Sequence, residues 1–101
     1  MSRYYVSQDA AVDLDAIWAF IARDSVEAAE RVDREFYETF ESLARMPEQG
    51  YQRKDVTKRS VRFFPLYSYL IIYEAGVDPI RIMAVIHGNR NLKRLLKERA
   101  F

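Results

Sequence analysis

The segment 59–90 constrains the fold most strongly, because it is dense in β-branched and aromatic residues and is interrupted by turn-forming residues. This composition predicts three strands. Ala75–Pro79 contains a glycine, an aspartate and a proline, which predicts a five-residue loop between strands at about Leu66–Glu74 and Ile80–His87. The two strands are therefore expected to form an antiparallel hairpin.

The two faces of this hairpin are expected to differ in character. If Glu74 lies opposite Ile80, the period-two alternation of side chains defines which residues share a face. One face is aliphatic and pairs Ile72 with Ile82, Leu70 with Ala84, and Ser68 with Ile86. The other pairs Tyr73 with Arg81, Ile71 with Met83, Tyr69 with Val85, and Tyr67 with His87. We expect the aliphatic face to be covered permanently by the same chain, and the aromatic and basic face to receive a partner.

The amino-terminal half predicts a short strand and a helical hairpin. Alternation over Arg3–Val6 indicates the strand, and Ser7 is a suitable N-cap for a helix over Gln8–Arg23. A second helix is expected after Asp24, which would form a capping box with a glutamate three residues later, and Pro47 ends it. The apolar stripe of the hairpin, expected to cover the aliphatic sheet face, carries Trp18, Phe36 and Phe40.

The remaining segments complete an α+β arrangement. Glu48–Lys58 is polar and predicts a surface loop, while Asn89 or Asn91 can cap a last short helix over Leu92–Arg99. The expected order is strand, two helices, three strands and a helical tail, which predicts a helical hairpin packed on an antiparallel sheet. The length of 101 residues suits a single domain over residues 1–101.

Composition limits the chemistry that we expect. The chain has no cysteine and one histidine, so neither a metal nor another cofactor is expected. No apolar run is long enough for a membrane span or a signal peptide, which predicts a cytoplasmic protein without a membrane partner. Residues 1–50 hold five basic and eleven acidic residues, a net charge of −6, whereas residues 51–101 hold eleven and four, a net charge of +7. The excess on the second half favours an anionic partner, and direct nucleic-acid binding stays open.

Three short motifs follow the predicted helical hairpin in a characteristic order. They are Arg62-Phe63-Phe64-Pro65, Tyr69-Leu70-Ile71-Ile72-Tyr73, and the strand from Ile82 that ends in His87-Gly88-Asn89-Arg90. In their order and spacing the chain resembles the ParE/RelE superfamily of bacterial toxins from type II toxin–antitoxin modules, over nearly its whole length. The resemblance implies a small toxin of a plasmid-stabilization type, neutralised by a ParD-like antitoxin whose carboxyl-terminal segment wraps the toxin surface.

The superfamily has two branches that differ in chemistry. The ParE-like branch binds DNA gyrase and traps it on cleaved DNA, and the RelE-like branch cleaves messenger RNA on the ribosome. The Arg-x-Phe-Pro and His-Gly-x-Arg motifs resemble the ParE-like branch more closely. Ribonuclease activity stays as the alternative, because Lys54 and Lys58 lie near the place where RelE-like members carry lysines or a carboxylate. A family member that is inactive and serves only as an interaction module is a third hypothesis.

These hypotheses assign roles to named residues. We expect the antitoxin to bind an apolar strip formed by Tyr67, Tyr69, Ile71, Tyr73, Met83 and Val85. We expect the target to be bound by Arg59, Arg62, Arg81, His87 and Arg90. A gyrase-binding toxin needs no catalytic residue, whereas a ribonuclease would use His87 for proton transfer, with Arg62 and Arg81 stabilising phosphorane charge.

Overall fold

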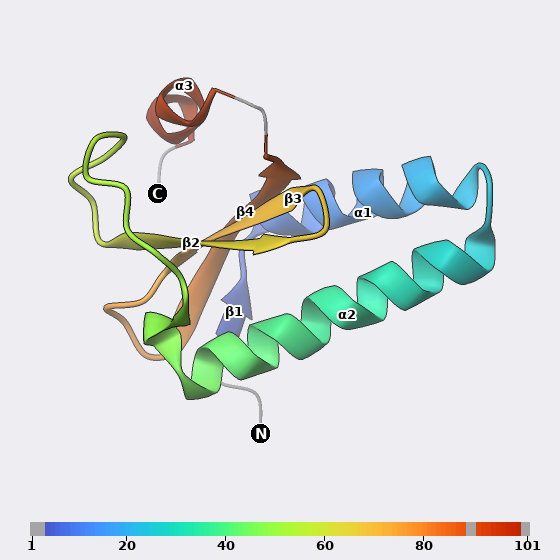
Figure 1. Cartoon of the computed structure of the whole chain (residues 1–101), viewed down its shortest axis with the longest axis horizontal. Coiled ribbons are helices and arrows are strands. Elements are labelled where there is room, and N and C mark those ends of the chain that lie inside the picture. Colours follow the sequence, from blue (N-terminus) through green and yellow to red (C-terminus); the bar gives the residue numbers. More distant parts are fainter. Residues whose placement is uncertain (1–3, 89–90, 100–101) are drawn as a thin grey trace.

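Two long helices lie on one face of a four-stranded sheet and one short helix lies on the other (Figure 1). The computed structural model describes residues 4–88 and 91–99. In chain order the elements are β1 (Tyr4–Val6), α1 (Gln8–Ala22), α2 (Val26–Arg45), a 3-10 turn η1 (Pro47–Gln49), β2 (Val61–Leu66), β3 (Tyr69–Glu74), β4 (Ile80–His87) and α3 (Leu92–Glu98). The predicted α+β architecture is confirmed.

Local signals define the two long helices much as expected. Ser7 caps α1, its hydroxyl accepting a hydrogen bond from the Ala10 amide at 3.1 Å. The cap of α2 is Ser25 rather than Asp24, since the Ser25 hydroxyl accepts from the Ala28 amide at 3.0 Å. Both helices begin where a hydroxyl side chain satisfies an amide that has no partner within the helix.

The sheet has the strand order β1-β4-β3-β2. β1 runs parallel to β4, and the pairs β3–β4 and β2–β3 are antiparallel. The predicted hairpin is present, and its loop spans Ala75–Pro79 as expected. Its first strand begins at Tyr69 rather than at about Leu66, because a turn at residues 67–68 ends β2 at Leu66. The first strand is confirmed over Tyr4–Val6, while Arg3 lies outside the described residues.

The predicted register of the β3–β4 hairpin is wrong by one residue near the loop and by two beyond it. Glu74 lies opposite Arg81 rather than Ile80, and Ile72 lies opposite Ala84. Tyr73 pairs with Ile82, and its neighbour Ile72 pairs with Ala84. One step along β3 thus corresponds to two steps along β4, so Met83 is the extra residue of a β-bulge. The bulge breaks the alternation, and Met83 therefore packs on the opposite face from Val85.

The helical hairpin covers the face that we expected to stay open. Phe36 and Phe40 of α2 pack in one cluster with Ile71, Tyr73 and Val85, rather than with the aliphatic face. Aromatic side chains fill the wide gap between helices and sheet; the ring centroids of Phe36 and Tyr69 are 5.7 Å apart in an edge-on arrangement. Trp18, expected in the buried stripe, is only partly buried, and the buried positions of α1 are Ala10 and Leu14.

The aliphatic face is covered by α3 instead. Leu95 and Leu96 pack on a cluster of sheet residues that contains Val61, Phe63, Leu70, Ile72, Met83, Ala84 and Ile86. Asn91 caps this helix, its side-chain oxygen accepting from the Arg94 amide at 3.1 Å. Each face of the sheet is therefore covered by helix, and the open aromatic strip that we predicted does not exist in this structure.

Candidate functional site

Most of the strip predicted to bind an antitoxin lies inside the protein. The side chains of Ile71, Tyr73 and Val85 are buried beneath α1 and α2, and that of Met83 is buried beneath α3. Tyr69 is half-buried. A partner can reach the buried positions only at places where the helices leave a gap.

Tyr67 is the exposed member of the predicted strip, with 56% of its surface accessible. It lies in the turn between β2 and β3 with a φ of 57°, a left-handed conformation that residues other than glycine seldom adopt. This conformation directs the ring towards α2, where the hydroxyl donates a hydrogen bond to Glu35 Oε1. The bond raises the pKa of the Tyr67 hydroxyl.

An apolar groove of about 310 Å³ opens between α1 and the sheet, where β3 begins at Tyr69 and β4 ends at His87. Its lining residues are Asp13, Ala16, Ile17 and Phe20 from α1, and Tyr69, Val85, Ile86 and His87 from the sheet. Phe20 is 65% exposed although it is a large apolar residue. The groove thus connects the surface with two residues of the predicted strip, Tyr69 and Val85.

An ion pair beside this groove joins α1 to the C-cap residue of α3. Asp13 of α1 accepts two hydrogen bonds of 2.8 Å from the guanidinium of Arg99 and one of 2.9 Å from the amide of Val85. The side chains of Arg99 and Asp13 are only 18% and 12% exposed. The hydrogen bond with Asp13 raises the pKa of Arg99. Sequence reasoning missed this pair, since Asp13 and Arg99 are 86 residues apart in the chain.

The arginines predicted to bind the target are held by the protein itself. The guanidinium of Arg62 donates to the carbonyl of Gly50 at 2.7 Å, and Arg81 donates to Glu74 at 3.3 Å. Arg59 is half-buried, and Arg90 lies outside the described residues. These contacts hold the guanidinium groups of Arg62 and Arg81, and the Arg81 side chain is still 39% exposed.

The structure does not bring the three predicted ribonuclease residues together. His87 and Arg81 stand at opposite ends of β4, and six residues of strand correspond to about 20 Å. Arg62 lies on β2 opposite Tyr73, whereas His87 lies opposite Tyr69. A proton-transfer group and its cationic partners at these separations cannot contact one phosphate.

Hydrogen bonds to a buried tyrosine position the loop before β2. The Tyr73 hydroxyl donates to the carbonyl of Pro47 at 2.6 Å and accepts from the amide of Gly50 at 2.8 Å. A Cβ atom at Gly50 would stand 2.6 Å from this hydroxyl oxygen, so only glycine fits. Burial raises the pKa of Tyr73, and the hydroxyl stays a neutral donor at neutral pH. The expected surface loop is thus anchored at its start.

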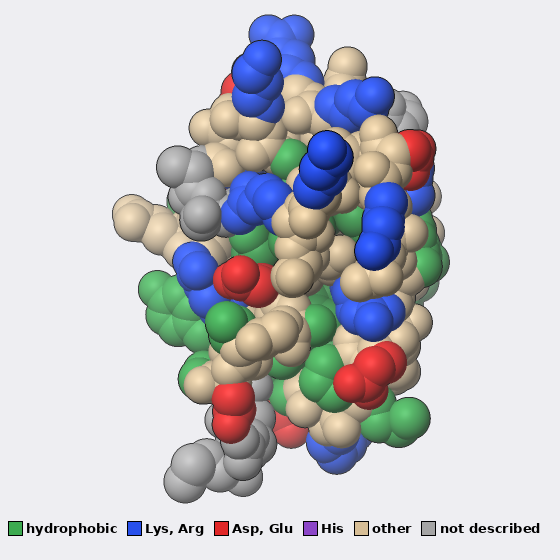
Figure 2. Space-filling model, turned by 90° about the vertical axis from the view of Figure 1, so that its left-hand side faces the viewer, with side chains coloured by type: hydrophobic (Ala, Val, Ile, Leu, Met, Phe, Trp, Pro, Cys, Tyr) green, Lys and Arg blue, Asp and Glu red, His purple; other side chains and the backbone are tan. Residues whose placement is uncertain are grey.

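The loop then runs beside α3 and forms a basic surface with it (Figure 1). Val56 of the loop packs against the cluster that holds Leu95 and Leu96. Figure 2 looks onto this side of the molecule, where Lys and Arg side chains gather over the upper half. We call this the basic surface; its cationic residues are Arg53, Lys54, Lys58, Arg59, Lys93 and Lys97.

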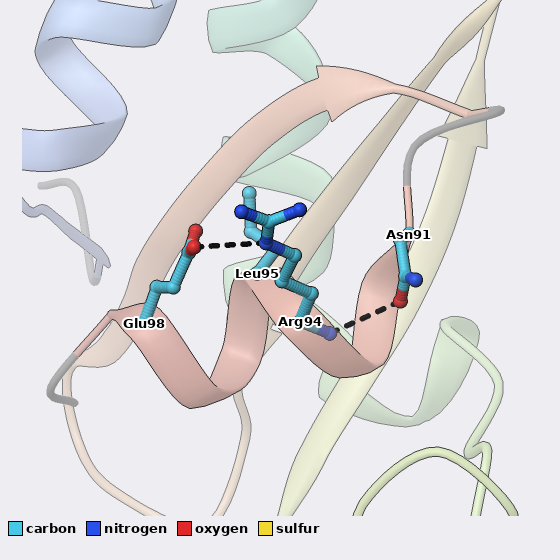
Figure 3. A pocket seen from close by; sticks show the side chains of 4 residues that line it. All are labelled: Asn91, Arg94, Leu95 and Glu98. Carbon is cyan, nitrogen blue, oxygen red and sulfur yellow. Dashed lines mark hydrogen bonds and ion pairs between the residues drawn. The ribbon is translucent and has the colours of Figure 1, made fainter.

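A shallow hollow on the outer side of α3 is shown in Figure 3. Its wall is formed by Asn91, Arg94, Leu95 and Glu98. The Arg94 guanidinium turns towards Glu98, with Nε 3.1 Å from Oε2, and both side chains are largely exposed. This pair neutralises itself, so Arg94 adds little to the charge of the basic surface.

Among residues 4–88 and 91–99, no three His, Cys, Asp or Glu side chains are grouped so that they could hold a metal ion. Within the same ranges, no helix combines the length and apolarity that a membrane crossing requires.

Comparisons with known proteins agree with the fold. Residues 4–92 match the family model of the ParE toxin of the type II toxin–antitoxin system parDE. Among solved structures, a chain described as the chromosomal ParDE TA system from P. aeruginosa is similar, with a TM-score of 0.70 and 22% sequence identity. The match covers 86% of this chain and 96% of that one. No curated protein matches the sequence significantly.

Proposed function

This chain belongs to the ParE toxin family of type II toxin–antitoxin systems, and from that membership we propose that it inhibits DNA gyrase and is neutralised by a cognate antitoxin. The observation that carries the proposal is the family match, which spans both long helices and the whole sheet. The toxin would act by binding gyrase, as the ParE-like branch does.

The geometry supports gyrase binding over the ribonuclease alternative. Cleavage of RNA through a 2′-hydroxyl needs a proton acceptor and cationic groups around one phosphate. His87 and Arg81 are separated by about 20 Å of strand, and Arg62 is engaged with the carbonyl of Gly50. We retain Arg59, Arg62, Arg81 and His87 as proposed contacts to the target, with His87 the exposed one.

A pair of assays on the purified chain tests this proposal. In the first, gyrase supercoils relaxed plasmid in the presence of the chain, and we expect supercoiling to fall and cleaved DNA to accumulate. In the second, ribosomes translate a defined messenger RNA, and we expect the message to stay intact. Ribosome-dependent cleavage that disappears in His87→Ala would establish the ribonuclease instead. Inactivity in both assays, with the antitoxin still bound, would assign the chain to the interaction modules.

For the antitoxin, we propose the groove between α1 and the ends of β3 and β4 as the point of entry. Its lining contains Tyr69 and Val85 of the predicted strip, and Phe20 is an exposed apolar residue with little cover from its own chain. Such a groove fits the apolar side of an amphipathic segment. Among the buried members of the strip, Ile71 and Tyr73 would be reached by displacing the helical hairpin, and Met83, on the opposite face, by displacing α3.

Replacing Phe20 tests the groove without disturbing the core. Phe20→Ala should weaken antitoxin binding by about 2 kcal/mol, because a central apolar anchor is lost while the fold is kept. Val26→Ala on α2 is the matched control, since Val26 is also an exposed apolar residue on the helical hairpin. Binding is measured by calorimetry with the antitoxin encoded beside the toxin. An equal loss of affinity in both variants would mean that the antitoxin does not bind at the groove.

A further inference from the structure

We infer that the basic surface, formed by the loop before β2 and by α3, binds the phosphate backbone of duplex DNA. The inference rests on the proposed action on gyrase, an enzyme that holds DNA, and adds a second contact for the toxin: the DNA itself. Neither segment makes this surface alone. Residues about 40 positions apart are brought side by side because both segments pack on the same face of the sheet (Figure 1).

The first observation is the concentration of cationic side chains that point outward. Lys54 and Lys58 on the loop are exposed, and so are Lys93 and Lys97 on α3. Two acids within these segments are already engaged, Asp55 with Arg53 at 2.8 Å and Glu98 with Arg94 at 3.1 Å, and Glu48 lies at the start of the loop in η1. The lysines are therefore not neutralised by these acids, and the surface has the charge that a nucleic-acid backbone requires.

The electrostatic effect of this arrangement is visible on Asp55. The hydrogen bond from Arg53 lowers the pKa of this carboxyl, and Lys93 on α3 adds to the lowering. Lys93 of α3 therefore lies close enough to the loop to act on one of its residues, so the two segments can contact the same partner.

The second observation is a small polar hollow inside the loop. It measures about 70 Å³ and is lined by Gln52, Arg53, Lys54, Thr57, Lys58, Arg59, Ser60 and Val61. Amide, hydroxyl and cationic groups dominate the lining, and these are the donors that bind phosphate oxygens. A space of roughly two or three water volumes admits a small anionic group and excludes a nucleobase. The hollow suits contact with the backbone rather than reading of bases.

The apolar side chains of the two segments argue against a protein partner at this surface. Val56 and Leu92 pack inward, and Leu95 and Leu96 are buried in the cluster on the sheet. Protein interfaces use an apolar or aromatic centre within a polar rim. Tyr51, at the start of the loop, stays 44% exposed and stacks on Phe63. The outward side of the rest of the loop and of α3 carries mainly polar and cationic side chains (Figure 2).

Salt-dependent binding to DNA tests the inference. The probe is a short fluorescent duplex, and affinity is measured by anisotropy over a range of KCl concentrations. Lys54→Gln with Lys58→Gln removes two charges from the loop, and Lys93→Gln with Lys97→Gln removes two from α3. Each pair should weaken binding on the order of tenfold at low salt and reduce the slope of log affinity against log salt by about 1.8, because each phosphate contact contributes about 0.9. Glutamine keeps the helix propensity of lysine, so α3 should stay folded.

A matched pair on the other side of the molecule provides the control. Arg31 and Arg34 are exposed on α2. Arg31→Gln with Arg34→Gln makes the same change in net charge, and it should alter affinity less than about twofold with an unchanged salt slope. An equal effect of all three pairs would reduce the binding to net charge and overturn the inference, as would an unchanged slope in both lysine pairs.

Other probes separate this inference from its alternatives. Single-stranded RNA of the same length that binds more tightly than the duplex would assign the surface to RNA, and polyglutamate that displaces the duplex at equal charge would assign it to an acidic protein; either result overturns the proposal. Gyrase inhibition is measured in parallel. Inhibition that persists fully in both lysine pairs would remove the DNA contact from the toxin's action while leaving gyrase inhibition intact. DNA binding without any effect on gyrase would retain the DNA contact and overturn the proposed gyrase inhibition.

Discussion

On one face of the sheet, α1 and α2 supply 15 and 20 residues of helix, whereas on the other α3 supplies seven. The longer cover is a hairpin of consecutive helices that contact each other as well as the sheet. The shorter cover is less than two turns long, and a helix of that length is not stable alone in water. It depends on two buried leucines and on the ion pair between Arg99 and Asp13.

The two covers of the sheet therefore contribute differently to stability and to the surface of the molecule. The helical hairpin and the face beneath it form the larger aromatic core, which holds the fold together. The face beneath α3 is closed by a small element whose outer side is basic, and the same element contributes two residues of the basic surface, Lys93 and Lys97. Three pairs of substitutions test the contrast.

The largest effect is expected beneath the helical hairpin. Phe40→Ala should lower the free energy of unfolding by about 3–5 kcal/mol, because Phe40 has no exposed surface and its loss leaves a cavity. Leu96→Ala beneath α3 should cost about 2 kcal/mol, since a short helix can settle into the space. Urea unfolding followed by circular dichroism measures both. Equal losses would mean that the two covers contribute alike.

A smaller effect is expected at the ion pair that holds the end of α3. Asp13→Asn leaves the guanidinium of Arg99 without its counter-charge and should lower the free energy of unfolding by about 2 kcal/mol. This loss is smaller than that expected for a fully buried pair, because both side chains are slightly exposed. Amide hydrogen exchange should become faster in α3 than in α2. Asp15→Asn, an exposed acid on the same helix, is the control and should leave α3 protected. Slow exchange throughout α3 in Asp13→Asn would show that the leucines alone suffice.

The smallest effect is expected on the outer side of α3. Arg94→Gln removes an exposed pair with Glu98 and should change the free energy of unfolding by less than about 0.5 kcal/mol. Arg99→Gln at the C-cap of the same helix should cost clearly more, because its pair with Asp13 is largely enclosed. Thermal unfolding of the two variants side by side gives the difference. If Arg94→Gln lowered the free energy of unfolding as much as Arg99→Gln, burial would not explain the difference expected between the two ion pairs.

Much of the fold could be predicted because its elements are signalled locally. Ser7, Pro47 and Asn91 mark helix ends through their own backbone and side-chain chemistry, and Ala75–Pro79 marks the loop between β3 and β4. Alternation on β3 was also predicted correctly, since Tyr69, Ile71 and Tyr73 share one face and Leu70 and Ile72 share the other. The family resemblance, carried by motifs on the same strands, is confirmed by the match over residues 4–92.

The candidate site was predicted less well, because it depends on contacts between distant segments. The bulge at Met83 is not marked by a glycine or a proline, so the alternation on β4 appeared regular. Both faces of the sheet are apolar enough to be buried, and the sequence offered no local reason to place the helices on the aromatic one. The strip predicted to be open is consequently closed, and the surface that remains is a groove at its end.

Short-range patterns in the chain were enough to define the helices, the strands, their order and the family, because caps, turns and alternation act over a few residues. The tertiary structure alone decided which helix covers which face, since that choice depends on the volumes and hydrogen-bonding partners of side chains that meet only after folding. The Tyr73 hydroxyl finds its partners 26 residues away, at Pro47, and Asp13 meets Arg99 across 86 residues. The basic surface has the same origin: two charged segments become one site only because both pack against the same side of the sheet.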